Sequence, residues 1–576
     1  MNFDKMTKEE LIDYINSLNE DQSGKYGLVW DKEKEPEQIV TDCDKYIPIL
    51  IEQDNNNIDN GTDNHLLIEG DNFHSLSVLN YTHKESIDII YIDPPYNTGN
   101  KDFVYNDRFV DLEDGYRHSK WLNFMQKRLK LARNLLTDDG VIFISIDDNE
   151  QAQLKMLLDS IFGEINYVGC LPRVTKKSGK QHSGDISKNH DYVLIYCKNR
   201  IDTAFRGIEE ETNGFDLEDE YVDTRGKYKL NQTLDYNSLW YNPAMDFPIE
   251  VGDETYYAGG TKKAHDDRHN GIHNPKDWVW RWSKAKFDFG LKNGFVVIKD
   301  GKDRPRIYTK TYLKATIGKN GNKYTIEYIS RENNLSSIAL TDNEYSNDNA
   351  KKELDGILKK SSFDFPKPTQ LIETLCNIVN KQDFTILDFF AGSDTTGHAI
   401  LKMNQKDGGH RKFILCTNNE NGICENVTYQ RISNSIKGYG KNKATGGSLK
   451  YYKTGFVNNS GTRDQLYYDL TEKCIPMLCV KSDTFELIEK NKEYVIYSNK
   501  GGTIYSCVYF DIFGETYNEF IKKIKGIKEH KNLYIFSLSE YVNEEIFKGI
   551  SNYSIEPIPY KILDLYKNVV KMSKEI

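Results

Sequence analysis

The sequence lacks the patterns that hold small secreted or cysteine-metal folds together. Nine cysteines occur among 576 residues, and none forms a Cys-x-x-Cys pair, so neither a disulfide framework nor a cysteine zinc site is expected. Free thiols are typical of a reducing compartment, and we expect a cytoplasmic protein. No apolar run approaches the roughly 18 residues of a membrane span, and the opening MNFDKMTKEELIDYI has no signal-peptide core.

Positive charge is also in short supply. The formal net charge is −11, with 76 lysines and arginines against 87 acids, which excludes a surface uniformly coated in positive charge. A local basic groove is still compatible with an acidic body, so the charge balance permits a nucleic-acid partner. No GxxxxGK[ST] phosphate loop occurs, so ATP hydrolysis is not expected of this chain.

Strand and helix patterns alternate between about residues 66 and 197. SIDIIYID and GVIFISIDD are continuous apolar strands that end in acids, and residues 117–136 place Trp121, Met125, Leu129, Ala132 and Leu136 at helical spacing. Such strands, separated by amphipathic helices, indicate a mainly parallel sheet covered on both faces. The sequence therefore predicts an α/β fold.

The composition changes several times along the chain. Around residue 200 it becomes polar, aromatic and irregular, and from about residue 361 the α/β rhythm returns. One sheet is therefore expected from two sequence blocks with an insertion between them, followed by a Tyr-rich tail. The predicted parts are an N-terminal extension at 1–60, a first half at 61–200, an insertion at 201–360, a second half at 361–450 and a small α/β domain at 451–576.

Three predicted strand ends carry residues suited to a ligand, which binds beyond the carboxyl ends of a parallel sheet. They are Asp71, DPPY at 93–96 and DFFAGS at 388–393. In DPPY the two prolines stiffen the turn, and the Asp93 carboxylate and the Pro94 carbonyl can accept two hydrogen bonds from an amino group. That localises the lone pair of the nitrogen for attack on a methyl group, and Tyr96 can stack on the ring for about 1–3 kcal/mol. The alternative is an ordinary Pro-Pro turn.

The string DFFAGSDTTG predicts a strand, a tight turn and a helix. Gly392 allows close approach of the backbone, and Ser393 and Thr395 can cap the helix, whose N-terminus attracts an anion such as a ligand carboxylate. A glycine turn before a capped helix is common without any ligand. Paired with DPPY in one domain, it indicates a binding site.

Through these two strings the chain resembles the β-class adenine-N6 DNA methyltransferases, in which DPPY precedes the FxGxG block. The string GDNFHSLSVLN…IDIIYIDPPYNTGNKDFVYND, with KYGLVWDKEKEP and ENVTYQRI, is most similar to Mod subunits of type III restriction–modification systems. The resemblance covers about residues 25–440. It implies a Rossmann-like class I methyltransferase fold with circularly permuted motif order: a catalytic half at 61–200, a target-recognition insertion at 201–360, a cofactor-binding half at 361–450 and a small C-terminal α/β domain.

The resemblance implies a site-specific enzyme that transfers a methyl group from S-adenosylmethionine to N6 of a flipped-out adenine in duplex DNA, with no metal. The catalytic residues would be Asp93, Pro94, Pro95 and Tyr96. The residues that would bind the cofactor are Asp71, Lys367, Asp388, Phe390, Ala391, Gly392, Ser393 and Thr395. His190 and Asp191 match a block beside the catalytic pocket, although a His-Asp pair before a strand is as often a capped loop.

Two positions depart from the family pattern. Asp394 stands where a small residue is usual, and its carboxylate should repel the methionine carboxylate unless it turns away to cap the helix. Thr417 stands where many relatives carry an acid for the cofactor ribose, and Glu420 is the alternative. We expect weakened cofactor binding at most.

Two stretches, 173–181 and 261–286, supply local positive charge, with tryptophans interleaved in the second, and are the predicted DNA-facing surfaces. Base flipping costs a few kcal/mol, which phosphate contacts must offset. The candidate DNA contacts are Lys176, Lys177, Lys262, Lys263, Arg281 and Trp282. A charge run is as often merely solvated.

The resemblance also implies partners: a homodimer, double-stranded DNA and a restriction subunit that hydrolyses ATP and cuts DNA. Several alternatives stay open, namely a solitary methyltransferase, an enzyme acting on cytosine N4, RNA adenine or a glutamine side chain, and a binding module without activity. By resemblance, Asp rather than Ser or Asn at position 93 favours adenine.

Overall fold

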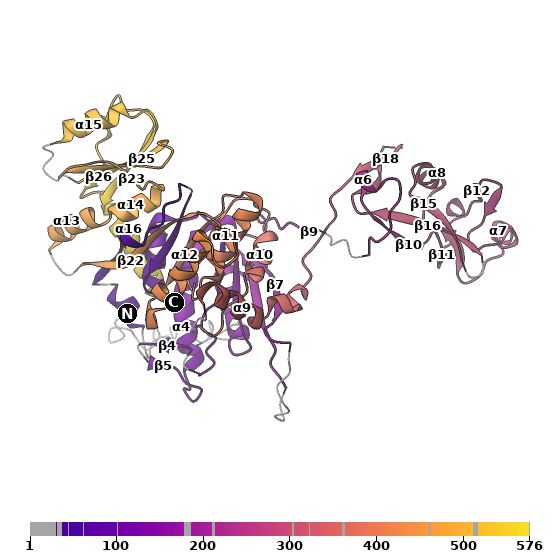
Figure 1. The fold of residues 1–576 in the computed structure, drawn as a ribbon, viewed down its shortest axis with the longest axis horizontal. Coiled ribbons are helices and arrows are strands. Elements are labelled where there is room, and N and C mark those ends of the chain that lie inside the picture. The colour runs from indigo at the N-terminus through magenta and orange to yellow at the C-terminus, as the bar shows by residue number, and fades with distance from the viewer. Residues whose placement is uncertain are drawn as a thin grey trace, which may run out of the picture. The chain divides into compact units, whose positions relative to one another are not determined.

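The chain forms two compact units. The computed structural model describes residues 30, 37–43, 45–61, 63–100, 102–106, 108–177, 186–209, 214–301, 304–321, 323–359, 363–459, 462–510 and 516–574. Unit 1 combines Met1–Phe205 with Ser336–Ile576, and unit 2 is Arg206–Leu335 (Figure 1). The finer division into five parts stays a prediction. Of the KYGLVWDKEKEP string, only Trp30 lies among the described residues.

Unit 1 is built around a nine-stranded sheet with the order β1-β22-β2-β21-β20-β3-β6-β8-β7. The strands from β22 to β6 are parallel, and antiparallel pairings attach β1 at one edge and β8 and β7 at the other. This arrangement confirms the expected α/β fold with a mainly parallel sheet. The strands are β1 (Tyr46–Glu52), β2 (Asn64–Glu69), β3 (Ile87–Ile92), β6 (Leu136–Ile146), β7 (Tyr167–Val174), β8 (His190–Cys197), β20 (Thr385–Asp388), β21 (Lys412–Thr417) and β22 (Ser448–Asn458).

Helices cover the sheet, whose central strands are buried along most of their length. In β3 every residue except Asp88 is buried, as expected where both faces of a parallel sheet are covered. Helices α3, α4 and α5 pack in sequence against one another, and α10, α11, α12 and α9 form a second packed group. Their bounds are α3 (Asn72–Thr82), α4 (Arg117–Leu135), α5 (Gln151–Phe162), α9 (Asn347–Leu358), α10 (Thr369–Asn377), α11 (Thr395–Asp407) and α12 (Tyr429–Lys437).

The helix predicted at 117–136 is confirmed as α4. Trp121, Met125, Leu129 and Ala132 are all fully buried, as helical spacing of apolar residues requires. The helix ends one residue earlier than expected, because Leu136 opens strand β6. This helix runs behind the segment that follows β3, which makes it important for the site.

The C-terminal segment of unit 1 adds a second sheet with the order β23-β24-β25-β26-β27. Its buried residues Val495, Val508 and Ile558 belong to the same hydrophobic core as Ile47 of β1 and Leu79 of α3. These elements are α13 (Arg463–Lys473), α14 (Ile475–Ser482), β23 (Glu486–Lys490), β24 (Tyr494–Ser498), β25 (Ile504–Tyr509), α15 (Tyr517–Gly526), β26 (His530–Ser537), β27 (Tyr553–Pro559) and α16 (Tyr560–Lys574).

Unit 2 is an assembly of short, mostly antiparallel strands with small helices. Its core contains Leu234, Ile249, Trp280, Phe287 and Ile307. The elements are β9 (Ile208–Glu209), α6 (Val222–Arg225), β10 (Tyr228–Thr233), β11 (Asp235–Ser238), η4 (Pro243–Met245), β12 (Ile249–Val251), β13 (Glu254–Tyr256), α7 (Lys262–His269), β14 (Asp277–Trp280), α8 (Lys284–Lys292), β15 (Val296–Asp300), β16 (Pro305–Tyr312), β17 (Ala315–Asn320), β18 (Lys323–Tyr328) and β19 (Glu332–Asn333).

Among the described residues of both units, no helix has the length and apolar character needed to cross a bilayer.

Candidate active site

The two strand ends singled out in the sequence lie side by side. β20 pairs directly with β3 in parallel register, with Leu387 opposite Ile90, so DPPY and DFFAGS leave the same edge of the sheet. The end of β2 reaches the same place, because the Asn72 side-chain amide donates to the Phe389 carbonyl at 3.2 Å. The expected meeting of these segments is confirmed.

The DPPY turn is held from behind by α4. The indole Nε1 of Trp121 donates to the Pro95 carbonyl at 2.7 Å, and Trp121 itself is fully buried. Oδ2 of Asp93 is paired with the Lys367 ammonium, whereas Oδ1 of Asp93 is shielded from solvent and has no hydrogen-bond partner among the described residues. A buried acceptor without a donor costs free energy, and Asp93 directly follows β3, beside the end of β20.

The Tyr96 ring is fixed by a buried ion pair. Its hydroxyl donates to Oδ2 of Asp191 at 3.3 Å, and Asp191 binds Arg173, whose Nε donates to Oδ1 at 2.8 Å. Burial, followed by the nearby Asp191 charge, raises the pKa of Tyr96. Lys367 Nζ also lies 5.1 Å from the centre of the Tyr96 ring. Asp191 thus belongs to the site, whereas its neighbour His190 is exposed.

The FFAGS turn is shaped by its own acid. Asp388 is buried, and its carboxylate accepts from the Phe390 backbone N–H at 3.0 Å and from the Thr396 hydroxyl at 2.6 Å. Burial raises the pKa of Asp388 to about 7. Gly392 adopts a left-handed φ of 50°, which glycine tolerates without strain. Ala391, Ser393 and Thr395 are largely buried around this turn, and Phe390 is half-buried.

Asp394 turns away from the turn that precedes it. Its Oδ1 accepts from the Gly397 backbone N–H at 3.0 Å as the N-cap of α11, and the residue is fully buried. Burial raises the pKa of this carboxyl. This is the capping geometry that the sequence offered as the alternative to repulsion of an anionic ligand.

Asp71, the third predicted strand-end residue, caps α3. Its Oδ1 accepts from the Phe73 backbone N–H at 2.7 Å and lies 3.4 Å from the buried Arg128 guanidinium. Thr417 closes β21 and is buried, and Glu420 is exposed just beyond it. Glu69, the last residue of β2, pairs with Thr417 in the sheet, so Glu69 and Asp71 place acids at the neighbouring strand end.

The candidate DNA contacts fall in both units. Lys176 and Lys177 are exposed after β7, and Lys262 and Lys263 are exposed at the start of α7. The list is completed by Arg281, exposed and 4.5 Å from the Tyr236 ring, and Trp282, half-buried against the core of unit 2. The first basic stretch is not uniformly solvated, because Arg173 is fully buried, and its residues 178–181 lie outside the described part of the chain.

Sequence reasoning missed the residues that orient the DPPY turn. No local sequence pattern marks Trp121 or Arg173 as part of the site. Trp121 fits the apolar face of a helix, and Arg173 fits a charged surface. Asn97, which directly follows DPPY, donates to Glu150 Oε1 at 2.5 Å, and His118 Nδ1 lies 2.7 Å from the same oxygen. Its place in the extended DPPYN string was the one signal for Asn97.

Glu150 should make stability depend on pH. Burial raises the pKa of this carboxyl from 4.5 to about 8, so between these values the folded chain keeps a proton that the unfolded chain releases. The protonated Glu150 carboxyl therefore makes its full contribution to the free energy of unfolding below about pH 4.5. This contribution is lost as the pH rises to about 8, by up to about 1.4 kcal/mol per pH unit. From about pH 5 to pH 8, the thermal midpoint of wild type should fall relative to that of Glu150→Gln. Parallel profiles in scanning fluorimetry would contradict this.

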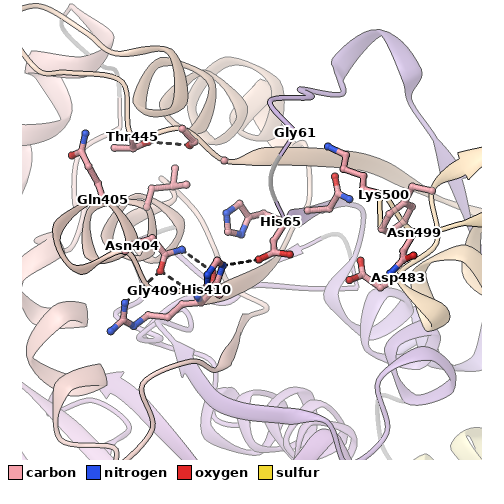
Figure 2. A pocket seen from close by; sticks show the side chains of 18 of the residues that line it. Gly61, His65, Asn404, Gln405, Gly409, His410, Thr445, Asp483, Asn499 and Lys500 are labelled. Atoms are coloured by element: carbon pink, nitrogen blue, oxygen red, sulfur yellow. Dashed lines mark hydrogen bonds and ion pairs between the residues drawn. The ribbon is translucent and has the colours of Figure 1, made fainter. Parts of the chain in front are cut away.

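A cavity of about 510 Å³ lies at the opposite end of the strands (Figure 2). It is lined by Asn64 and His65 at the start of β2, by His410 just before β21, and by Asn499 and Lys500 between β24 and β25. Because β2 and β21 run parallel to β3 and β20, the cavity lies at the amino ends of these four strands. None of the site residues predicted from the sequence lines it.

Known proteins were compared with the chain. The sequence profile of a family described as DNA methylase, covering N6 and N4 methyltransferases, matches residues 87–500. The Mod subunit of the type III restriction–modification enzyme EcoPI of Escherichia phage P1 is 34% identical over 400 residues, which cover 63% of this chain and 58% of that subunit. The StyLTI Mod subunit of Salmonella typhimurium is 31% identical over 457 residues, covering 75% and 62%.

A third relative is described as a type II methyltransferase rather than a type III subunit. The type II methyltransferase M.KpnI of Klebsiella pneumoniae is 32% identical over 372 residues, which cover 63% of this chain and 82% of M.KpnI. The chain thus spans most of M.KpnI but less than two thirds of the length of either Mod subunit.

Proposed function

Because this chain belongs to the family of N6 and N4 DNA methylases, we propose that it transfers a methyl group from S-adenosylmethionine to N6 of an adenine flipped out of duplex DNA. The observation that carries the proposal is the direct parallel pairing of β20 with β3. It brings the turn that carries the Asp93 carboxylate and the Pro94 carbonyl next to a glycine turn at a helix N-terminus.

The residues around the glycine turn fit this cofactor. Gly392 leaves the backbone open to close approach, and Oδ1 of the Asp394 carboxylate is engaged at the helix cap, which favours capping over repulsion of a methionine carboxylate. Asp71 would hold the adenosine end, and Lys367 would lie toward the methionine end. When bound, S-adenosylmethionine supplies a sulfonium-borne methyl carbon, with sulfur taking the electron pair of the C–S bond as the N–C bond forms.

The chain's own residues would prepare the amino group. Oδ1 of Asp93 has no partner and, with the Pro94 carbonyl, would accept both N–H bonds of the amine, which localises the nitrogen lone pair. Tyr96 would stack on the flipped base, with its orientation set by Asp191. The proton released from nitrogen would go to water, with the Asp93 carboxylate within reach as a first acceptor.

The choice of adenine is the finer part of the proposal. The family covers both N6 and N4 acceptors, and the resemblance through Asp93 favours adenine. Unit 2 would read the DNA sequence, with Lys262 and Lys263 contacting phosphates. Cytosine N4, RNA and protein amines are the competing acceptors, and a binding module without activity is the competing class.

One experiment separates these acceptors. The full chain is incubated with labelled S-adenosylmethionine and duplex DNA, RNA or protein, and modified DNA is mapped by long-read sequencing. N6-methyladenine at one sequence motif is the expected result. If the label appears on cytosine N4, or only on RNA or protein, that group is the acceptor instead of adenine N6. If no label is transferred with saturating cofactor, the result favours a binding module without activity.

We further propose a cytoplasmic homodimer that serves as the modification subunit beside an ATP-dependent restriction subunit. The names of the EcoPI and StyLTI relatives support this assembly, and the type II name of M.KpnI supports a solitary enzyme instead. Light scattering of the purified chain tests the dimer. A neighbouring gene for a helicase-nuclease distinguishes the two assemblies.

Asp394 should have little influence on cofactor affinity. Because its carboxylate caps α11 and faces away from the turn, Asp394→Gly is expected to change the affinity for S-adenosylmethionine less than about threefold, and glycine as an N-cap costs only a few tenths of a kcal/mol. Calorimetric titration of both proteins measures this. A tenfold gain in the variant would mean that the carboxylate does repel the cofactor.

A further inference from the structure

Three side chains of unit 2 place potential metal ligands around one point. His265 and His269 lie four residues apart on one face of α7, and Asp246 directly follows η4. One ligand atom from each lies within 4.8 Å of the other two. Residues at this helical spacing are neighbours on the helix surface, so a single ion can reach both imidazoles.

The His265 imidazole is oriented as a metal ligand would be. Its Nδ1 lies 3.3 Å from Oδ1 of Asp266; in the tautomer that carries its proton on Nδ1, this carboxylate accepts that proton and Nε2 keeps its lone pair. Nε2 is shielded from solvent and has no hydrogen-bond partner in the part of the chain that the structure describes. Metal-bound histidines typically donate their other ring N–H to a carboxylate or carbonyl in this way.

The Asp246 carboxylate is likewise held in place. It is 1% exposed, and Arg268 donates to its two oxygens at 2.8 and 2.9 Å. The Tyr241 hydroxyl donates to Oδ2 at 3.0 Å and lies 3.4 Å from His269 Nδ1. An ion pair with Arg268 is enough to explain why the Asp246 carboxylate is buried. That ion pair does not explain Nε2 of His265, which has no hydrogen-bond partner among the described residues.

We propose that unit 2 binds one zinc ion through Asp246, His265 and His269. Two imidazoles and one carboxylate form a ligand set suited to Zn²⁺, and the fourth position is open to water. An ion on Oδ2 takes the place of the Tyr241 hydrogen bond, while Arg268 keeps the carboxylate oriented. The ion ties α7 to the segment after η4.

This site differs from the sequence expectation of no metal, which concerned catalysis and cysteine ligands. It also stands apart from the proposed methyl transfer, since none of its ligands belongs to unit 1. The carboxylate is distant from the two histidines in sequence, so the histidine spacing on α7 was the only local sign. Metal binding can therefore be tested whether or not the chain methylates DNA.

The test uses the full chain, freed of metal and titrated with Co²⁺ alone. Visible d–d absorption typical of tetrahedral cobalt is expected, saturating at one ion per chain and abolished by added Zn²⁺. His265→Ala, His269→Ala and Asp246→Asn should each weaken Zn²⁺ affinity more than about 100-fold, beyond the loss typical of an outer-shell partner. Calorimetry measures these affinities.

The controls are His273→Ala, outside the ligand set but close to it, and His410→Ala in unit 1. Both should bind Zn²⁺ as wild type does, and circular dichroism without metal checks that every variant folds. Absence of the cobalt band in wild type would overturn the proposal. So would unchanged Zn²⁺ affinity in folded His265→Ala and His269→Ala.

Discussion

Replacing Asp93 with alanine is expected to lower the rate of methyl transfer at least about 100-fold, the loss typical when one positioned catalytic hydrogen-bonding group is removed. Oδ1 of Asp93 is the unpartnered acceptor at the junction of β3 and β20, so its removal leaves the amino group with the Pro94 carbonyl alone. The substitution also removes the partner of the Lys367 ammonium, so the affinity for the cofactor is determined beside the rate to separate the two effects. Single-turnover methylation and calorimetry measure the two quantities separately.

Asp148→Ala is the matched control for this substitution. Asp148 follows β6 at the same edge of the sheet and hydrogen-bonds to the Tyr192 hydroxyl at 2.9 Å. It does not contact the DPPY turn through any hydrogen bond of the described residues, so its loss should leave the rate within about twofold. An Asp93→Ala protein that methylates at the wild-type rate would overturn the proposed role of this carboxylate.

Replacing Arg173 with methionine is expected to cost about 3–5 kcal/mol of stability, because it leaves the Asp191 carboxylate buried without its partner. Arg173 is fully buried and Asp191 is 2% exposed. The arginine also donates to the Tyr345 carbonyl at 2.6 Å and to Asn347 Oδ1 at 3.0 Å. These bonds tie β7 to the start of α9. Thermal and urea unfolding of the full chain measure the loss.

The double variant Arg173→Met/Asp191→Leu separates stability from function. With both charges gone, most of the lost stability should return, whereas the Tyr96 hydroxyl loses its acceptor, Asp191. Methylation should then remain low in a stable protein. Lys177→Met, an exposed neighbour on the same stretch, should stay within about 0.5 kcal/mol of wild type. A single Arg173→Met variant as stable as wild type would contradict this account.

Much of the fold could be read from residue order, because strand and helix periodicity is a local property. The apolar runs of β3 and β6 and the spacing of Trp121, Met125 and Leu129 each depend on neighbours within two or four positions. The DPPY and FFAGS turns are equally local, since proline and glycine set backbone angles where they stand. The parallel sheet then follows from strands that alternate with helices.

Contacts between distant segments could not be read in this way. Lys367 pairs with Asp93, and Arg173 reads as part of a basic surface although it is buried against Asp191. A charged residue looks the same in sequence whether it meets water or a partner, because only packing determines its desolvation. The same holds for Asp394. Its identity in the sequence allowed either repulsion of a ligand carboxylate or capping of α11, and only the contact of its side chain distinguishes the two.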